Sequence, residues 1–317
     1  MTDAFEDRFK GVLFGQAVGD ALGLGTEFMS RAQVRDRYPD GLHSYEQIIR
    51  DAHRKRWKRG DWTDDTEQMT LIVDSLLESK AVDVCDIGRR FAHWEGQGGV
   101  GVGDTVYAVL HHQLFFTDPH AAAEEVWEST DRWVAANGAV MRTAALGLWE
   151  GHDEAKVIAN AENVCKITHF DPRCVASCVA VCVAIRRLVH GERDIESIIA
   201  CVRPIATAYD PRVAPFFESA QSENIEDLNL DDEETMGYTL RALGAGIWAL
   251  RFATSFEDGI LKIIHQGGDA DTNASVAGAL LGARFGYDAI PRTWLEGLTW
   301  KKFMYRISDE LYRACTA

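Results

Sequence analysis

Apolar residues recur at helical spacing along nearly the whole chain, and no segment alternates between apolar and polar positions as a half-buried strand does. Stretches with a period of about 3.6 residues cover residues 5–25, 65–79, 86–94, 121–135, 139–149, 153–167, 175–185, 196–209, 236–252 and 273–286. No Pro-rich or Gly/Ser-rich linker and no repeat of fixed period divides the chain. The sequence therefore predicts an all-α protein with one domain over residues 1–317.

Net charge and cysteine usage indicate which partners the protein does not attract and in which cellular compartment it works. A net charge of −16 argues against general attraction to nucleic acid or to anionic lipid. The acidic N-terminus lacks the basic-then-apolar order of a signal peptide, and the longest apolar run, Val175–Ile185, is shorter than the roughly 20 residues of a membrane span. Seven cysteines without scaffold spacing indicate a reducing cytoplasm.

Cys174, Cys178 and Cys182 share one face of the apolar run. We interpret these three thiols as core residues and not as metal ligands, because free cysteine behaves as a small apolar side chain. Two loops stand out by charge: residues 50–61 are basic and residues 223–234 are acidic. Both are expected to be solvated connections, although the basic loop leads directly into the next motif and an anionic ligand near it stays possible.

Two turns crowd carboxylates at predicted helix starts. Thr63, Asp64 and Asp65 open the helix at 65–79, and Asp269, Asp271 and Thr272 precede the one at 273–286. Either set alone is explained by helix capping and by the helix dipole. Two sets together offer many oxygen ligands, which suit Mg²⁺, Mn²⁺ or Ca²⁺ and do not suit structural zinc.

Competing motifs for the second turn fail. An EF-hand starting at Asp269 needs Gly at its sixth position and Glu at its twelfth, where this chain has Ala274 and Leu280. A phosphate-binding P-loop pattern is absent, and no βαβ context surrounds the Asp-x-Asp pair.

Three more segments have the composition of a binding site. The glycine-ended first helix leads to Glu27, and a glycine-dense stretch, residues 96–105, precedes a helix whose backbone amides can hold phosphate. Asn137 and Gly138 are predicted to start a further helix, and His169 stands just before a helix that begins with proline.

In chain order, the segments GDALGLGTEF, WTDDTEQM, VGDT, NGAVMR, THFDP and GGDADT…AGALLGA resemble the ADP-ribosylglycohydrolase family, especially its dinitrogenase-reductase-activating branch. They span about Gly15 to Gly286, which is most of the chain. The resemblance implies a compact, orthogonal multi-helix bundle with a binuclear Mg²⁺ or Mn²⁺ centre in a cleft.

The resemblance also implies roles for individual residues. Asp271 would bridge the two ions, and Glu27 or Asp64 would act as the base for the attacking water. The implied metal ligands are Thr63, Asp64, Asp65, Asp269, Asp271 and Thr272, and the implied catalytic residues are Glu27, Asp64 and Asp271. The implied ligand-binding residues are Gly98, Gly99, Gly101, Gly103, Asn137, Gly138, Met141 and His169, with Phe170 and Tyr209 as candidates for stacking on adenine.

The activity that the resemblance implies is hydrolysis of the bond between ADP-ribose and a modified side chain, with ADP-ribosyl-arginine as the expected substrate and a monomer as the expected state. Nucleic acid would enter only as a modified substrate. Ala139 replaces a serine of several relatives, and the basic loop before TDDT is unusually long, so the linkage that is cleaved stays open. Two other classes also stay open: a silent ADP-ribose-binding or structural protein, and a metal-dependent nucleotide phosphoesterase.

Overall fold

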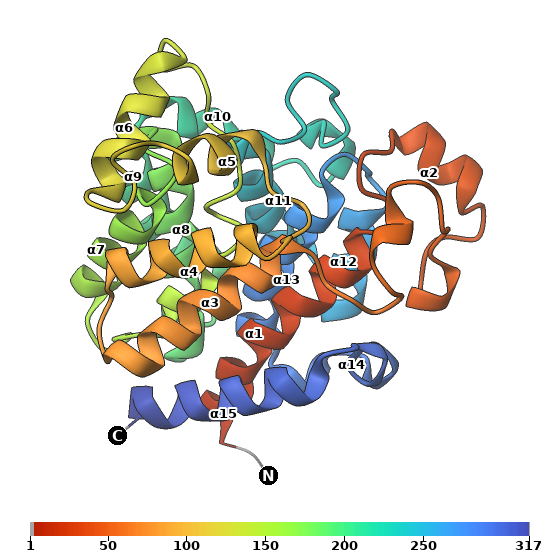
Figure 1. Cartoon of the computed structure of the whole chain (residues 1–317). Coiled ribbons are helices and arrows are strands. Elements are labelled where there is room, and N and C mark those ends of the chain that lie inside the picture. The colour runs from red at the N-terminus through yellow and green to blue at the C-terminus, as the bar shows by residue number, and fades with distance from the viewer. Residues whose placement is uncertain (1–2, 317) are drawn as a thin grey trace.

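The computed structural model describes residues 3–316, and fifteen α-helices make up most of this range (Figure 1). Within it no β-strand forms, and two isolated bridges join Met29 to Gly268 and Ala136 to Tyr238. The all-α prediction is confirmed. The helices are α1 (Ala4–Gly23), α2 (Arg31–Arg37), α3 (Asp64–Ser79), α4 (Val84–Gly96), α5 (Asp104–Leu110), α6 (Pro119–Ser129), α7 (Glu154–Cys165), α8 (Pro172–Val189), α9 (Ile195–Tyr209), α10 (Ala214–Ser219), α11 (Thr239–Phe252), α12 (Phe256–Ile264), α13 (Ala270–Phe285), α14 (Arg292–Gly297) and α15 (Lys301–Thr316).

The central pair, α1 and α13, packs backbone against backbone along a seam of small residues. The seam consists of Gly11, Gly15, Gly19 and Gly23 on α1, which face Gly282, Gly278, Ala274 and Ala270 on α13. A Cβ at Gly15 would lie 2.2 Å from the carbonyl oxygen of Gly278, and a Cβ at Gly278 would lie 2.1 Å from that of Gly15. Only residues without a side chain allow this approach. The pairing order makes the two helices antiparallel.

The seam brings the end of α1 to the start of α13. A Cβ at Gly23 would lie 2.4 Å from the carbonyl oxygen of Ala270. Beyond the helices the contact continues, because the Phe28 amide donates to Gly268 O at 2.6 Å and the Gly268 amide donates to Met29 O at 2.8 Å. The loop that carries Glu27 is therefore held against the turn that carries Asp269 and Asp271.

Other helices surround this pair. In Figure 1, α3 lies beside α1 with α4 on its outer side, α15 runs along the base of the molecule, and α7, α8 and α9 form one flank. The helix predicted from the apolar run is α8, and Cys174, Cys178 and Cys182 are fully buried in it, as the core interpretation predicted. None of the helices in residues 3–316 combines the length and the apolar character that a bilayer span requires.

Two helix predictions were wrong in part or in full. The predicted helix at 121–135 ends at Ser129, and Asp131 and Arg132 follow with left-handed φ of 52° and 59°. Residues 139–149 form turns and a short 3-10 helix, Ala144–Gly147, so Asn137 and Gly138 do not start a helix. Tertiary contacts hold this segment: Gln16 donates to Met141 O at 2.9 Å, and a Cβ at Gly147 would lie 2.7 Å from Cys182 O.

Candidate metal centre and ligand cavity

A carboxylate from α1 caps the N-terminus of α3. Asp20 accepts hydrogen bonds from the backbone amides of Thr63 and Thr66 at 2.9 and 3.0 Å, and from their hydroxyls at 2.9 and 2.6 Å. The Thr63 side chain makes no capping hydrogen bond. Since its hydroxyl donates to Asp20, the hydroxyl lone pairs stay available to another group.

At the start of α13, as at the start of α3, the side chain at the cap position does not cap the helix. Asp269 occupies the cap position without a capping hydrogen bond, and one of its oxygens accepts from Asn137 Nδ2 at 2.8 Å. Elsewhere in the described chain, Asp83, Asp153 and Ser255 do cap their helices. Capping of their own helices by Thr63 and Asp269, the alternative that explains either set alone, is therefore not observed.

The structure brings these two turns together. Thr63 Oγ1 lies 3.3 Å from Asp65 Oδ2 and 3.4 Å from Asp271 Oδ2. One carboxylate oxygen from each of Glu27, Asp269 and Asp271 lies within 4.8 Å of the others, which is a spacing that a metal ion can span. Asp65 Oδ1 is buried and has no hydrogen-bond partner among the described residues.

Burial makes it unfavourable for all the carboxyl groups of this cluster to be ionised at once without a cation. Burial, and next the neighbouring carboxylates, raise the pKa of Asp64, Asp65 and Asp271 well above the ordinary value. Burial raises the pKa of Asp20 to about 7, although four hydrogen bonds oppose the shift. A divalent cation removes this electrostatic cost, and an oxygen-only donor set fits Mg²⁺ or Mn²⁺.

Glu27 is held by the basic loop. His53 Nε2 lies 2.5 Å from Glu27 Oε2, and Arg56 donates to His53 Nδ1 at 2.6 Å. Because Nδ1 accepts from Arg56, the ring hydrogen lies on Nε2 and is donated to Glu27. Burial raises the pKa of Glu27, and the hydrogen bond from His53 acts in the opposite direction.

A cavity of about 560 Å³ opens beside the carboxylates. Its wall includes Glu27, Asp64, Asp65, Asp269, Asp271 and Thr272, and from the predicted ligand-binding set Gly101, Gly103, Asn137, Gly138, Met141 and His169. Gly98 and Gly99 do not line it, and Thr63 is buried behind it. Phe170 is part of the wall, whereas Tyr209 instead donates to Glu162.

Two residues of the site, Trp127 and Asp20, were not predicted from the sequence. Trp127 lines the cavity, its ring centroid lies 5.8 Å from that of Phe170, and its indole N–H donates to Asp171 Oδ2 at 2.9 Å. Asp20 was also missed, because its role as a cap depends on the contact between α1 and α3. Its position within the glycine-spaced segment GDALG was the available signal.

A buried network links the carboxylates to His169. Gln68 donates to Asp64 at 3.2 Å and accepts from Arg142 at 2.5 Å, while Arg142 donates to Thr168 Oγ1 at 2.6 Å. Thr168 Oγ1 in turn lies 2.8 Å from His169 Nδ1. Arg142 is fully buried above the ring of Phe91, so it is fixed in place by packing as well as by hydrogen bonds.

This network determines the protonation state of His169 and which of its ring nitrogens carries a hydrogen at the cavity wall. Burial, and secondly the charge of Arg142, lower the pKa of His169 to about 3, so the ring is neutral. Arg142 can only donate, and no further acceptor for the Thr168 hydroxyl lies among the described residues, so that hydroxyl donates to Nδ1. Nε2 then carries the hydrogen. This nitrogen is buried at the cavity wall and has no hydrogen-bond partner within residues 3–316.

The raised carboxylate pKa values predict a pH-dependent response to metal. As pH falls, the metal-free carboxyls of Asp64, Asp65 and Asp271 take up protons, which a cation must displace. We expect Mn²⁺ to raise the melting temperature by on the order of 5 °C at pH 7.5, corresponding to about 2.7 kcal/mol at 100-fold excess over Kd, and by much less at pH 5. Thermal melts with Mn²⁺ and with EDTA at both pH values test this. Equal shifts at both would contradict it.

The all-α fold thus places a buried cluster of carboxylates, whose oxygens could hold a metal ion, on the wall of one cavity. The chain belongs to the ADP-ribosylglycohydrolase family, which matches residues 1–317.

Known proteins similar to this chain cover almost all of it. An ADP-ribosylarginine hydrolase of Serratia proteamaculans is 26% identical over 96% of this chain and 79% of its own. The ADP-ribosyl-dinitrogen-reductase glycohydrolase of Rhodospirillum rubrum is 29% identical over 93% of this chain and 91% of its own. A solved structure described as an ADP-ribosylglycohydrolase-related protein complex has 28% identity and a TM-score of 0.77, covering 98% of this chain and 99% of the other.

Proposed function

We propose that this protein hydrolyses the glycosidic bond between ADP-ribose and a modified side chain, with ADP-ribosyl-arginine as the substrate. One observation carries the proposal. Two helix starts that are far apart in sequence carry carboxylates that do not cap their own helices, and these carboxylates line one shared cavity. The names of the Serratia and Rhodospirillum relatives support the reaction, and the first of them supports the arginine linkage.

The metal site in this proposal uses the oxygen ligands at the two helix starts. Thr63, Asp64, Asp65, Asp269, Asp271 and Thr272 would hold two Mg²⁺ or Mn²⁺ ions. The orphaned Asp65 Oδ1 and the free lone pairs of the Thr63 hydroxyl fit this role. When bound, the ions would supply positive charge that orients ribose hydroxyls and acidifies water.

Residues of the protein itself would transfer protons and stabilise charge during the reaction. Glu27, oriented by His53, accepts a proton from the attacking water, and burial raises its pKa, which makes it a stronger proton acceptor than an exposed glutamate. The water oxygen bonds to the anomeric carbon of the ribose while the carbon–nitrogen bond to arginine breaks, and the leaving guanidine takes up a proton. Nearby carboxylates stabilise the positive charge that develops on the sugar.

The cavity wall holds the rest of ADP-ribose. His169 Nε2–H donates to an oxygen of the ligand, and Phe170 and Trp127 provide ring faces for adenine. Gly101 has φ of 104°, and a Cβ there would lie 2.1 Å from Asp64 Oδ1. The Gly101–Gly103 backbone can therefore approach both the carboxylates and a bound phosphate.

The proposal is tested by incubating the purified protein with ADP-ribosyl-arginine, ADP-ribosyl-serine and ADP-ribosylated nucleic acid, with Mg²⁺ or with EDTA, and identifying products by mass. Release of intact ADP-ribose from the arginine conjugate only with metal is the expected result. AMP as the main product would favour the phosphoesterase class. Binding of ADP-ribose without release from any conjugate would favour a silent binding protein.

Replacing Thr168 by valine is expected to weaken ADP-ribose binding roughly tenfold, or about 1.4 kcal/mol. Valine keeps the shape of the side chain, but it no longer fixes the tautomer of His169 and leaves one Arg142 donor unpaired. Titration calorimetry measures the affinity for ADP-ribose. Thr168→Ser retains the hydroxyl and should bind like the parent protein, and equal weakening in both variants would exclude the tautomer argument.

A further inference from the structure

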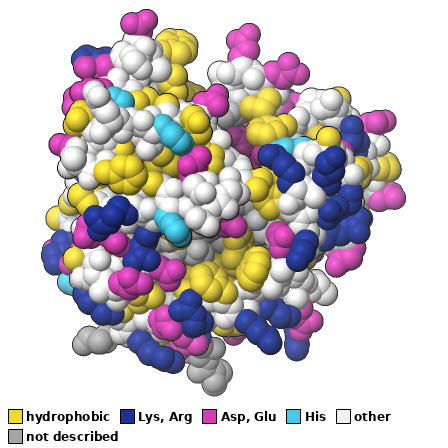
Figure 2. Space-filling model, viewed as in Figure 1, with side chains coloured by type: hydrophobic (Ala, Val, Ile, Leu, Met, Phe, Trp, Pro, Cys, Tyr) yellow, Lys and Arg dark blue, Asp and Glu magenta, His cyan; other side chains and the backbone are white. Residues whose placement is uncertain are grey.

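The segment Arg50–Asp61, called here the basic loop, concentrates positive charge in an acidic protein. It holds six of the 33 Lys and Arg residues of the chain, against two carboxylates, although the net charge of the whole chain is −16. The six are Arg50, Arg54, Lys55, Arg56, Lys58 and Arg59. Figure 2 shows dark-blue side chains gathered on the side of the molecule that carries α2 and this loop.

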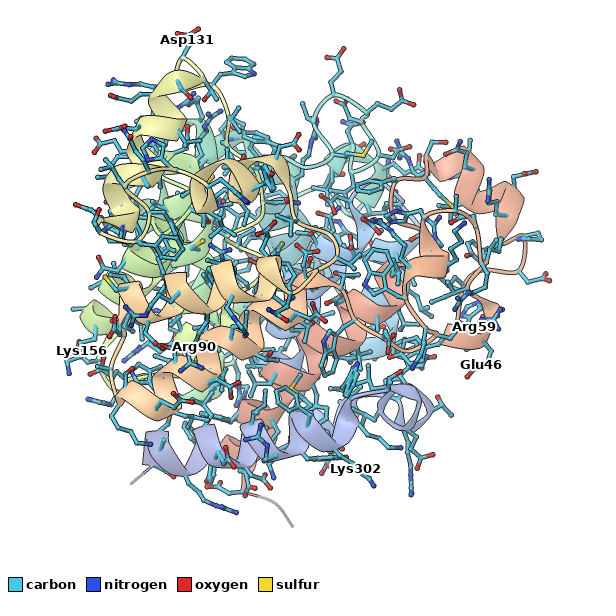
Figure 3. The ribbon with its side chains drawn as sticks, viewed as in Figure 1. Glu46, Arg59, Arg90, Asp131, Lys156 and Lys302 are labelled. Carbon is cyan, nitrogen blue, oxygen red and sulfur yellow. The ribbon has the colours of Figure 1, made fainter. Side chains whose placement is uncertain are left out.

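Most of this charge is not neutralised within the molecule. Arg54 is buried and pairs with Asp51, whereas the other five cations are exposed and form no ion pair within the described residues. The guanidinium of Arg59 donates only to Ile48 O. By contrast, Lys156, on the opposite side of the molecule in Figure 3, pairs with Glu150 at 2.5 Å.

The basic loop borders the cavity at its carboxylate end. His53 contacts Glu27, and its ring centroid lies 5.2 Å from that of Phe28, an exposed residue; both of these neighbours line the cavity. The guanidinium of Arg56 lies 4.5 Å above the ring of Trp57. The loop is thus anchored against the cavity rim while its remaining cations face solvent.

We propose that the basic loop is a docking surface for an acidic segment of the modified protein, close to its ADP-ribosylated side chain. The inference rests on the proposed function, because ADP-ribose in the cavity places the bond to be cleaved, and hence the acceptor protein, next to Glu27. Cations without an ion pair at the cavity rim attract carboxylates on that acceptor protein. They thereby raise the rate at which the acceptor and this protein form a productive complex.

A protein fits this surface better than a nucleic acid does. A net charge of −16 repels a long polyanion from most of the molecule. Single strands also need several exposed aromatic faces for successive bases. Here Trp57 is buried, and Phe28 is the exposed ring at the rim. A short acidic peptide requires only the local charge.

The experiment compares two peptides that carry one ADP-ribosyl-arginine, flanked either by Asp and Glu or by Ser and Gln. The test protein is the double variant Lys55→Glu, Lys58→Glu, whose side chains make no hydrogen bond in the structure. The charge-matched control is Lys80→Glu, Arg313→Glu, two exposed residues near the ends of α3 and α15 that form no ion pair with residues 3–316. Binding of the unmodified acidic peptide, labelled with fluorescein, is measured in parallel.

We expect the parent protein to prefer the acidic peptide roughly tenfold in kcat/KM at low salt, and less at high salt. The basic-loop variant should lose this preference yet process the neutral peptide at the parent rate, and the control should keep it. Equal rates on both peptides, or an equal loss in the control, would overturn the docking surface. So would displacement of the labelled peptide by a short oligothymidylate at a lower concentration than by unlabelled peptide.

The two proposals fail differently. If neither peptide releases ADP-ribose, the proposed function falls. The binding measurement still decides the docking surface, because acidic-peptide binding that disappears in the basic-loop variant supports it and absence of binding to the parent protein overturns it.

Discussion

Asp271→Ala is expected to reduce release of ADP-ribose by roughly a thousandfold or more, equivalent to about 4 kcal/mol of transition-state stabilisation. Asp271 lies within 4.8 Å of both Glu27 and Asp269 and within 3.4 Å of Thr63 Oγ1, so its removal takes away the group that links the two helix starts. Product release from ADP-ribosyl-arginine measures the effect.

Stability measurements separate this effect from misfolding. Without metal, Asp271→Ala should melt at or above the temperature of the parent protein, because one buried, mutually repelling carboxylate is gone. The response to Mn²⁺ should vanish. Asp104→Ala is the matched control, since Asp104 is an exposed carboxylate of the same cavity wall outside the cluster. Retained activity in Asp271→Ala, or equal loss in Asp104→Ala, would contradict the assignment.

The second large effect is predicted for Gly15→Ala, which adds one methyl group in the seam between α1 and α13. That Cβ would lie 2.2 Å from the carbonyl oxygen of Gly278, and the backbone of α13 cannot move without shifting the carboxylates at its start. We expect the free energy of unfolding to fall by roughly 3 kcal/mol or more, out of the 5 to 15 kcal/mol typical of folded proteins. Urea denaturation measures it.

Gly244→Ala is the control for the seam. Gly244 is also buried in a helix interior, in α11, but a Cβ there would meet its nearest atoms at an ordinary 3.9 Å. The same substitution should therefore stabilise the protein, by about 1 kcal/mol, through helix propensity. A similar loss of stability in both variants would show that the seam is not the cause.

Some of this structure could be predicted from the sequence because it depends on local pattern. The buried α8 follows from an uninterrupted apolar run, and the carboxylate turns stand out because a helix cap needs one acceptor and each turn offers more. The same reasoning failed at residues 139–149, where apolar spacing resembles a helix but contacts with the distant Gln16 and Gln68 hold the chain in turns. Local patterns contain no information about such distant contacts.

The seam and Asp20 show the same limit. Gly11, Gly15, Gly19 and Gly23 are spaced four apart, which was a visible signal for close helix packing, but the sequence does not identify α13 as the partner. Asp20 acts on a helix that begins more than forty residues later. The His53 contact that orients Glu27 also depends on how the basic loop folds back, whereas the sequence predicted a solvated loop and left a role near an anionic ligand open.

The seam between α1 and α13 determines which amino-acid substitutions can alter the geometry of the site. The separation between the Glu27 loop and the Asp269 turn is set by one main chain resting on another, with no side chain between them. Leucines and valines elsewhere in the core can therefore be exchanged, and the surrounding helices can shift, without altering that spacing. A short list of glycines is therefore enough to keep the Glu27 loop and the Asp269 turn in register with each other.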